Sequence, residues 1–336
     1  MSPANLHVVS GKGGTGKTTV AAAVAIALAS GGRRTLLMEV EGRQGIAQLF
    51  DTPPLPYEER RVAVAPGGGE VWALAVDAEE ALLDYLEIFY NLRRAGSALR
   101  KLGAIDFATT IAPGLRDVLL TGKAVEVARR SDKTDKTEKA DRSVPSGANA
   151  YDAVIIDAPP TGRVTRFLNV NAEVSGLARV GPIHNHAQLV MTVINSPATR
   201  VHLVTVLEEM PVQETLDGIT ELQSVGLNTG MILINMVAAE RLNQAQAAAI
   251  RFGSVTATDL GPALQRAGID RDVETLGAGL LKGGRDHLRR VELQARERAR
   301  LRAEHLPTIE LPLLTDGVDL GGLYQLAAAL TEGGLQ

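Results

Sequence analysis

The amino-acid sequence predicts an α/β fold: a doubly wound, mostly parallel sheet with a helical insertion. Short apolar runs recur along the 336 residues, helical patterns separate them, and a glycine-rich turn joins the first apolar run to the first helical pattern. Continuous apolar runs are typical of strands that helices cover on both faces. Strands that alternate with helices favour a parallel sheet.

The N-terminal segment predicts a βαβ unit. Residues 6–10 (LHVVS) fit a buried strand, residues 18–30 an Ala-rich helix, and residues 35–40 a second strand. Gly31 and Gly32 end the helix, since glycine readily adopts the left-handed conformation that follows a helix. A unit of this kind requires a parallel pair of strands with a right-handed crossover.

The rest of the chain repeats this alternation. A helix is expected over residues 212–225, after Pro211, and an exposed, ion-paired helix over residues 286–304. Further strands are predicted at residues 71–76, 153–157, 201–207, 231–236 and 309–311. Together these elements predict a single domain over residues 1–336.

Two stretches interrupt the alternation. Residues 78–130 predict two or three inserted helices with a break at Pro113 and Gly114. Residues 131–150 are charged and nearly free of apolar side chains. This second stretch is expected to be a mobile surface loop, because it cannot bury enough apolar surface to become ordered.

The composition excludes several classes of site. The chain has no cysteine, so disulfides, thiolate metal sites and cysteine nucleophiles are excluded. The formal net charge of -4 provides no general basic field for nucleic acid. No apolar run reaches the roughly 20 residues that span a bilayer. We therefore expect a cytoplasmic protein with no nucleic-acid partner and no integral membrane segment.

A phosphate-binding motif lies between the first strand and the first helix. Residues 11–18 (GKGGTGKT) fit the P-loop pattern G-x-x-x-x-G-K-[ST] in full. The glycines let backbone N–H groups point at phosphate oxygens, and the helix that begins there directs its positive dipole end at them. Lys17 is expected to reach the β- and γ-phosphates, and Thr18 to ligate Mg²⁺. The predicted nucleotide-binding residues of the loop are Gly13, Gly14, Thr15, Gly16, Lys17, Thr18 and Thr19.

Two charged residues complete the expected site. Lys12 is a cation that the motif itself does not require. It can stabilise charge on the transferring phosphoryl group, in a neighbouring subunit if it cannot reach its own nucleotide. Asp157 ends the strand of residues 153–157 and is expected to hold Mg²⁺, directly or through water. Thr161 and Gly162 follow, where a backbone N–H can approach the γ-phosphate.

On these residues the sequence resembles a family of ATPases. Residues 12–18 resemble the signature-lysine P-loop shared by ArsA, the GET-pathway targeting ATPase, MinD, ParA and nitrogenase iron protein. Residues 157–162 (DAPPTG) resemble the switch II motif D-T-A-P-T-G-H, and residues 207–215 (LEEMPVQET) resemble the segment P-E-x-x-x-x-x-E-T. Both segments indicate the ArsA/GET branch. Asn235 lies where the family has its adenine-reading asparagine, and Pro312 lies in a segment similar to the adenine-side loop.

The resemblance implies a dimeric ATPase that uses ATP or ADP and Mg²⁺, with the nucleotides at the subunit interface. Lys12 then acts across that interface, and hydrolysis opens and closes the pair. The second subunit is either an identical chain or a related ATPase. An unknown protein or small-molecule cargo is expected at the helices of residues 78–130, where relatives bind theirs.

The sequence departs from the family in three respects. Glu41 replaces the switch I aspartate that positions the attacking water, so hydrolysis is expected to be slow. The alternative is a regulatory subunit that pairs with a competent relative. The absence of cysteine rules out arsenite binding through thiolates. Residues 78–130 contain no methionine, which disfavours a groove for varied apolar helices. The apolar residues Tyr85, Leu86, Phe89, Tyr90 and Leu92 are therefore interpreted as helix core.

Two other functions remain open. A tail-anchored-protein targeting factor is one. A positioning ATPase of the MinD/ParA type is the other, and it needs a C-terminal amphipathic membrane helix or a basic DNA-binding face. Residues 323–336 contain no lysine or arginine, which weighs against the membrane version. His184 and His186 form an H-x-H pair with no third ligand nearby, so a surface loop is expected there rather than a metal site.

Overall fold

A single sheet organises the chain. The structure, a computed structural model, describes residues 5–90, 113–134, 150–177, 182–315 and 317–335. The eight strands lie in the order β3-β4-β2-β5-β1-β6-β7-β8, and every pairing is parallel except the antiparallel pair β3 and β4. Their bounds are β1 (Leu6–Gly11), β2 (Arg34–Glu39), β3 (Arg60–Val64), β4 (Glu70–Ala75), β5 (Ala153–Asp157), β6 (Thr199–Thr205), β7 (Thr229–Val237) and β8 (Thr308–Pro312). The predicted α/β class with a mostly parallel sheet is confirmed.

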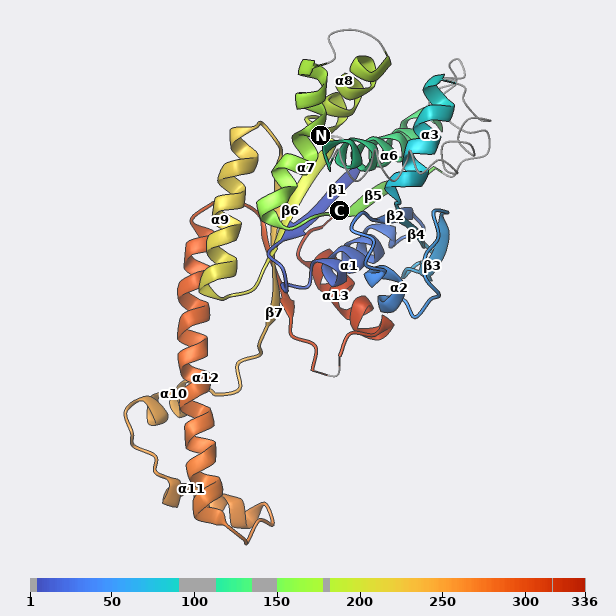
Figure 1. The fold of residues 1–336 in the computed structure, drawn as a ribbon. Helices are drawn as coiled ribbons and strands as arrows, with labels where there is room; N and C mark the ends of the chain where they lie inside the picture. Colours follow the sequence, from blue (N-terminus) through green and yellow to red (C-terminus); the bar gives the residue numbers. More distant parts are fainter. Residues whose placement is uncertain (1–4, 91–112, 135–149, 178–181, 316, 336) are drawn as a thin grey trace.

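Helices cover both faces of this sheet (Figure 1). One face carries α1 (Lys17–Ala29), α2 (Gly45–Leu49) and α13 (Leu320–Glu332). The other carries α3 (Ala78–Tyr90), α6 (Pro113–Thr134), α7 (Thr161–Leu177), α8 (Pro182–Ile194), α9 (Glu209–Ser224) and the C-terminal end of α12 (Val273–Arg302). Because strand side chains alternate between faces, neighbours such as Val8 and Val9 belong to the two opposite cores.

The strand order places the functional segments at one edge. In a parallel sheet the carboxyl ends of the strands meet, and ligands bind in the crevice outside them. Here β1 lies between β5 and β6, with β2 and β7 beyond. The P-loop follows β1, Glu41 follows β2, Thr161 follows β5, and Asn235 lies near the end of β7. The fold therefore gathers these predicted residues at one edge of the sheet.

Helices α10 (Gln244–Arg251) and α11 (Ala257–Arg266) were not predicted. Both pack on α12, at the end remote from the sheet (Figure 1). Neither buries an apolar side chain fully: α10 has no buried residue among its eight, and in α11 only Gly261 is buried. The predicted helix of residues 286–304 is confirmed, but it forms only the C-terminal part of α12, which has 30 residues.

The inserted segment differs from expectation at its C-terminal end. Helix α6 begins at Pro113, as the predicted break requires, but continues to Thr134, so residues 131–134 are helical and not part of a loop. Arg130 is buried and paired with Glu59 and Glu126, which ties the end of this helix to the body of the protein. The rest of the predicted loop, residues 135–149, lies outside the described residues, as do residues 91–112, including Leu92.

No helix in the described ranges is long and apolar enough to cross a membrane. Helix α13, near the C-terminus, packs against the sheet beside α1. Its apolar side chains Leu323, Leu326 and Leu330 are buried in the core that α1 shares.

Two buried histidines predict acid sensitivity of the fold. The rings of His7 and His202 stack with centroids 5.3 Å apart, and His7 Nδ1 lies 3.0 Å from His202 Nε2. Met231 N donates to His202 Nδ1 at 3.2 Å, which requires neutral His202 with its proton on Nε2. Burial, and secondarily His7, lowers the pKa of His202 from 6.5 to about 3. The unfolded chain therefore binds more protons, and stability falls as the pH drops from about 6.5 towards 3.

We expect His202 to remove about 2 kcal/mol of unfolding free energy between about pH 7.5 and pH 5. Urea denaturation at both values measures this loss. In His202→Gln, which keeps a donor and an acceptor but does not titrate, the pH dependence should be weaker by that amount. An equal pH dependence in the two proteins would contradict the assignment.

Candidate nucleotide-binding site

The P-loop is open toward solvent. It joins β1 to α1, with Gly14 at φ 88° and Gly16 at φ 82°, and a Cβ on Gly13 or Gly14 would meet no atom within 4 Å. By contrast, a Cβ on Gly16 would lie 2.5 Å from Asn235 Nδ2. Thr15 is buried and donates its hydroxyl to Lys12 O at 2.8 Å, which closes the turn from within. The side chain of Thr15 thus supports the loop from inside, and Gly13 and Gly14 leave open space where a ligand can approach the backbone.

The expected metal ligands are in contact. Thr18 Oγ1 donates to Asp157 Oδ2 at 2.7 Å. Asp157 is buried, and this burial raises its pKa to about 6, although Thr18 and Lys17 oppose the shift. Burial also lowers the pKa of Lys17, against the attraction of Asp157 and Glu41. A hydroxyl beside a carboxylate at the start of the P-loop helix is the donor set that Mg²⁺ requires in such sites, so these residues fit the metal.

Glu41 lies near the same group of residues. Its carboxylate is paired with Arg43 at 3.6 Å and with Arg163 of α7 at 3.7 Å, and its side chain is 19% exposed. The turn that carries it needs left-handed backbone at Gly42 (φ 68°) and Gln44 (φ 57°). The two arginine pairs hold Glu41 between its own turn and α7, close enough to Lys17 to attract it electrostatically.

Lys12 forms an ion pair within its own chain. Its Nζ contacts Glu214 Oε1 on α9, and Thr161 Oγ1 donates to Glu214 Oε2 at 3.4 Å. Thr161 is buried at the first position of α7, and the neighbouring Gly162 is exposed. One carboxylate thus connects the signature lysine to switch II. The sequence marked Glu214 only as part of a motif and gave it no role.

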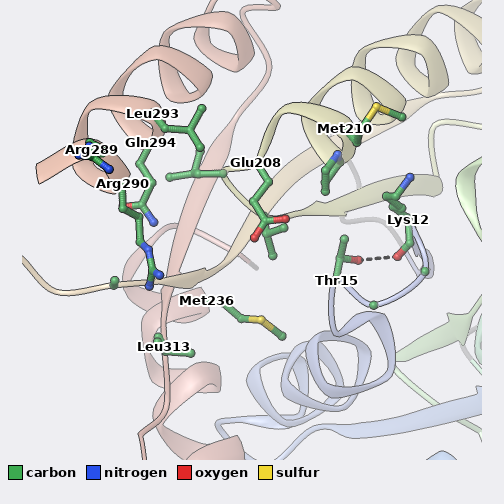
Figure 2. A pocket seen from close by; sticks show the side chains of 16 residues that line it. Lys12, Thr15, Glu208, Met210, Met236, Arg289, Arg290, Leu293, Gln294 and Leu313 are labelled. Carbon is green, nitrogen blue, oxygen red and sulfur yellow. Dashed lines mark hydrogen bonds between the residues drawn. The ribbon is translucent and has the colours of Figure 1, made fainter. Parts of the chain in front are cut away.

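A pocket of about 820 Å³ extends from the P-loop toward β7 and α12 (Figure 2). The P-loop lines it from Lys12 to Thr15, and Met236, Arg289 and Arg290 line it farther along. The contribution of α12 was not predicted, because Arg289 and Arg290 are far from the loop along the chain.

The two residues predicted on the adenine side have different surroundings. Asn235 is buried and donates from Nδ2 to Thr15 O at 2.9 Å, so it supports the P-loop backbone. Pro312 ends β8, and Leu313 after it lines the pocket. Adenine contact by Asn235 and Pro312 remains a prediction.

His184 and His186 were expected in a loop, but they lie on helix α8. Burial lowers the pKa of His186, whose ring packs against Gly122 of α6. The described residues contain no group of three or more potential metal-ligating histidine, aspartate or glutamate side chains. The interpretation of Tyr85, Leu86, Phe89 and Tyr90 as core concerns side chains that the structure does not describe.

Comparison with known proteins agrees with this geometry. The model of the family described as anion-transporting ATPase matches residues 5–196. The ATPase BagA of Mycobacterium tuberculosis is 48% identical over 339 residues, which cover 100% of this chain and 95% of that protein. An arsenical pump-driving ATPase of Acidiphilium multivorum is 29% identical over 257 residues, 71% of this chain and 41% of that protein. One from Escherichia coli is 27% identical over the same shares of both chains. The chain therefore belongs to the anion-transporting ATPase (ArsA) family.

Proposed function

We propose that this chain binds MgATP at the P-loop and hydrolyses it. The observation that carries the proposal is the open glycine loop between two features: the contact of Thr18 with Asp157 on one side and the pocket on the other. In this arrangement the phosphates contact the backbone N–H groups of residues 13–19, and the base extends into the pocket.

Five side chains each have one role in the proposed reaction. Lys17 binds the β- and γ-phosphates, Thr18 ligates Mg²⁺, and Asp157 holds the metal directly or through water. Glu41 orients the attacking water. Lys12 stabilises the charge that develops on the transferring phosphoryl group.

We further propose that the protein forms a dimer with nucleotide at the subunit interface. Lys12 and the exposed glycines of the P-loop lie on the surface that a second subunit would cover. Hydrolysis would open and close the pair and move the helices of residues 78–130, where an unknown protein or small-molecule cargo binds. The second subunit is an identical chain or a related ATPase.

Single-turnover hydrolysis tests the enzymatic proposal. With the purified protein in excess over ATP, we expect ADP to form in Mg²⁺ and not in EDTA. The Lys17→Ala variant is the negative control for this measurement. If wild type forms ADP no faster than this variant does, the proposed activity is wrong.

Glutamate in place of aspartate at position 41 favours one alternative function, a regulatory subunit that hydrolyses ATP slowly or not at all. Glu41 places its carboxylate one methylene farther from the backbone than aspartate does, and a misplacement of about 1 Å costs about a hundredfold in rate. We therefore expect Glu41→Asp to raise the single-turnover rate about tenfold or more, with ATP affinity unchanged.

Glu41→Gln is the control, because it keeps the length of the side chain and removes its charge; it should abolish the reaction. An unchanged or lower rate in Glu41→Asp would mean that glutamate suits this site, which contradicts the idea of a brake. For the MinD/ParA-type alternative, the burial of the apolar face of α13 against the sheet disfavours use of this helix as a membrane anchor.

A further inference from the structure

Glu39 is a buried carboxylate beside the nucleotide-binding site. It is the last residue of β2 and lies directly opposite Asp157 of β5 in the register of the sheet. Paired residues of adjacent parallel strands project to the same face, here the face that α1 covers. Glu39 is only 2% exposed. Two carboxylates therefore stand side by side at the carboxyl ends of two central strands.

The two oxygens of Glu39 have different surroundings. Oε2 accepts a hydrogen bond from Ile46 N at 3.3 Å, at the start of α2. Oε1 is buried and has no hydrogen-bond partner in the part of the chain that the structure describes. A buried carboxylate oxygen without a partner is costly, and glutamine could accept from Ile46 N equally well. Support of α2 alone therefore does not explain why this residue is a glutamate.

The segment that Glu39 holds packs against the expected metal ligand. A Cβ on Gly45 would lie 3.2 Å from Thr18 Cγ2 and 3.9 Å from Thr18 Oγ1. Thr18 in turn donates to Asp157. Asp157 thus has Glu39 beside it in the sheet and Thr18 in contact with it at the start of α1, and a divalent cation bound here would compensate the charge of both carboxylates.

We propose that Glu39 is a second carboxylate of the Mg²⁺ site, where its Oε1 accepts a hydrogen bond from a metal-bound water. This inference rests on the proposed function. Mg²⁺ keeps several waters and is bound through one or two carboxylates together with substrate phosphates, so a carboxylate that holds a water suits it. Groups that orient metal ligands in this way typically contribute tenfold to a hundredfold to metal affinity.

Metal binding without turnover provides the test. Mn²⁺ is titrated into the full chain saturated with ADP, and free Mn²⁺ is followed by electron paramagnetic resonance. We expect Glu39→Gln to weaken Mn²⁺ binding about tenfold or more. ADP affinity in EDTA should stay within about twofold, because the P-loop is intact.

Asp152→Asn is the matched control. Asp152 also accepts a backbone N–H bond, from Arg34 N at 2.7 Å, but it lies at the opposite end of β5. This variant should bind Mn²⁺ as wild type does. Equal Mn²⁺ affinity in Glu39→Gln and wild type would overturn the inference. Failure of wild type to bind ADP even in EDTA would instead overturn the proposed function, so the two failures can be distinguished.

Thermal stability in EDTA gives a second readout. Glu39→Gln should melt at or above the wild-type temperature, because it keeps the acceptor for Ile46 N and removes an unpaired buried charge. A lower melting temperature combined with unchanged Mn²⁺ affinity would assign Glu39 to the fold and not to the metal.

Discussion

Lys17→Ala is expected to weaken ATP binding at least about a hundredfold and to abolish hydrolysis, with the fold intact. A lysine bound to phosphate oxygens makes charge-assisted hydrogen bonds that contribute about 1.5–3 kcal/mol each, and two such bonds account for this loss. The surroundings increase the effect. Asp157 and Glu41 attract Lys17 electrostatically, so its removal leaves both carboxylates facing an anionic ligand. Isothermal titration with a non-hydrolysable ATP analogue measures the loss.

Lys282→Ala is the control for charge removal, since Lys282 is exposed on α12. This variant should bind nucleotide as wild type does. Circular dichroism and thermal melting check that Lys17→Ala is folded. A folded Lys17→Ala protein with wild-type affinity would mean that the nucleotide does not use this loop.

The parallel part of the sheet could be predicted because its signal is local. Strand β5 shows this most clearly: residues 153–157 are apolar up to the terminal Asp157, and the structure has the same bounds. Strand β3 was missed for the opposite reason. It is an antiparallel edge strand in which Arg60 and Arg61 are exposed, so it lacks a continuous apolar run. Helices α10 and α11 bury little, and they were missed although each begins with a capping box, Asn243 with Gln246 and Thr256 with Asp259.

Some residues of the site could be predicted from sequence and others could not, for the same reason. The P-loop and Asp157 are recognisable because the chemistry requires particular residues at fixed spacing. Glu39 is not, because a glutamate in a strand has meaning only when the register puts it beside Asp157. The same holds for Arg289 and Arg290, which α12 brings to the pocket from a distant part of the chain. Pairing across the sheet and helix packing decide such contacts, and neither follows from local pattern.

Lys12→Ala is expected to leave ATP affinity within about threefold of wild type. It should lower the rate of hydrolysis about a hundredfold to a thousandfold, as removal of a group that acts mainly in the transition state does. In the single chain Lys12 is paired with Glu214 on α9. If that pairing persists in the dimer, Lys12 has no catalytic role and the variant keeps its rate. A rate equal to that of wild type would therefore contradict the proposed role of this lysine.

Mixing of variants shows in which subunit Lys12 acts. Lys12→Ala retains Lys17 and binds ATP, whereas Lys17→Ala retains Lys12 but lacks a competent P-loop. If Lys12 acts across the interface, a mixed dimer has one complete site, and an equimolar mixture should recover about a quarter of wild-type activity. If Lys12 acts on its own nucleotide, no site in the mixture is complete and no activity returns. Differently tagged copies confirm that mixed dimers form, and an inactive mixture that contains them would contradict the arrangement across the interface.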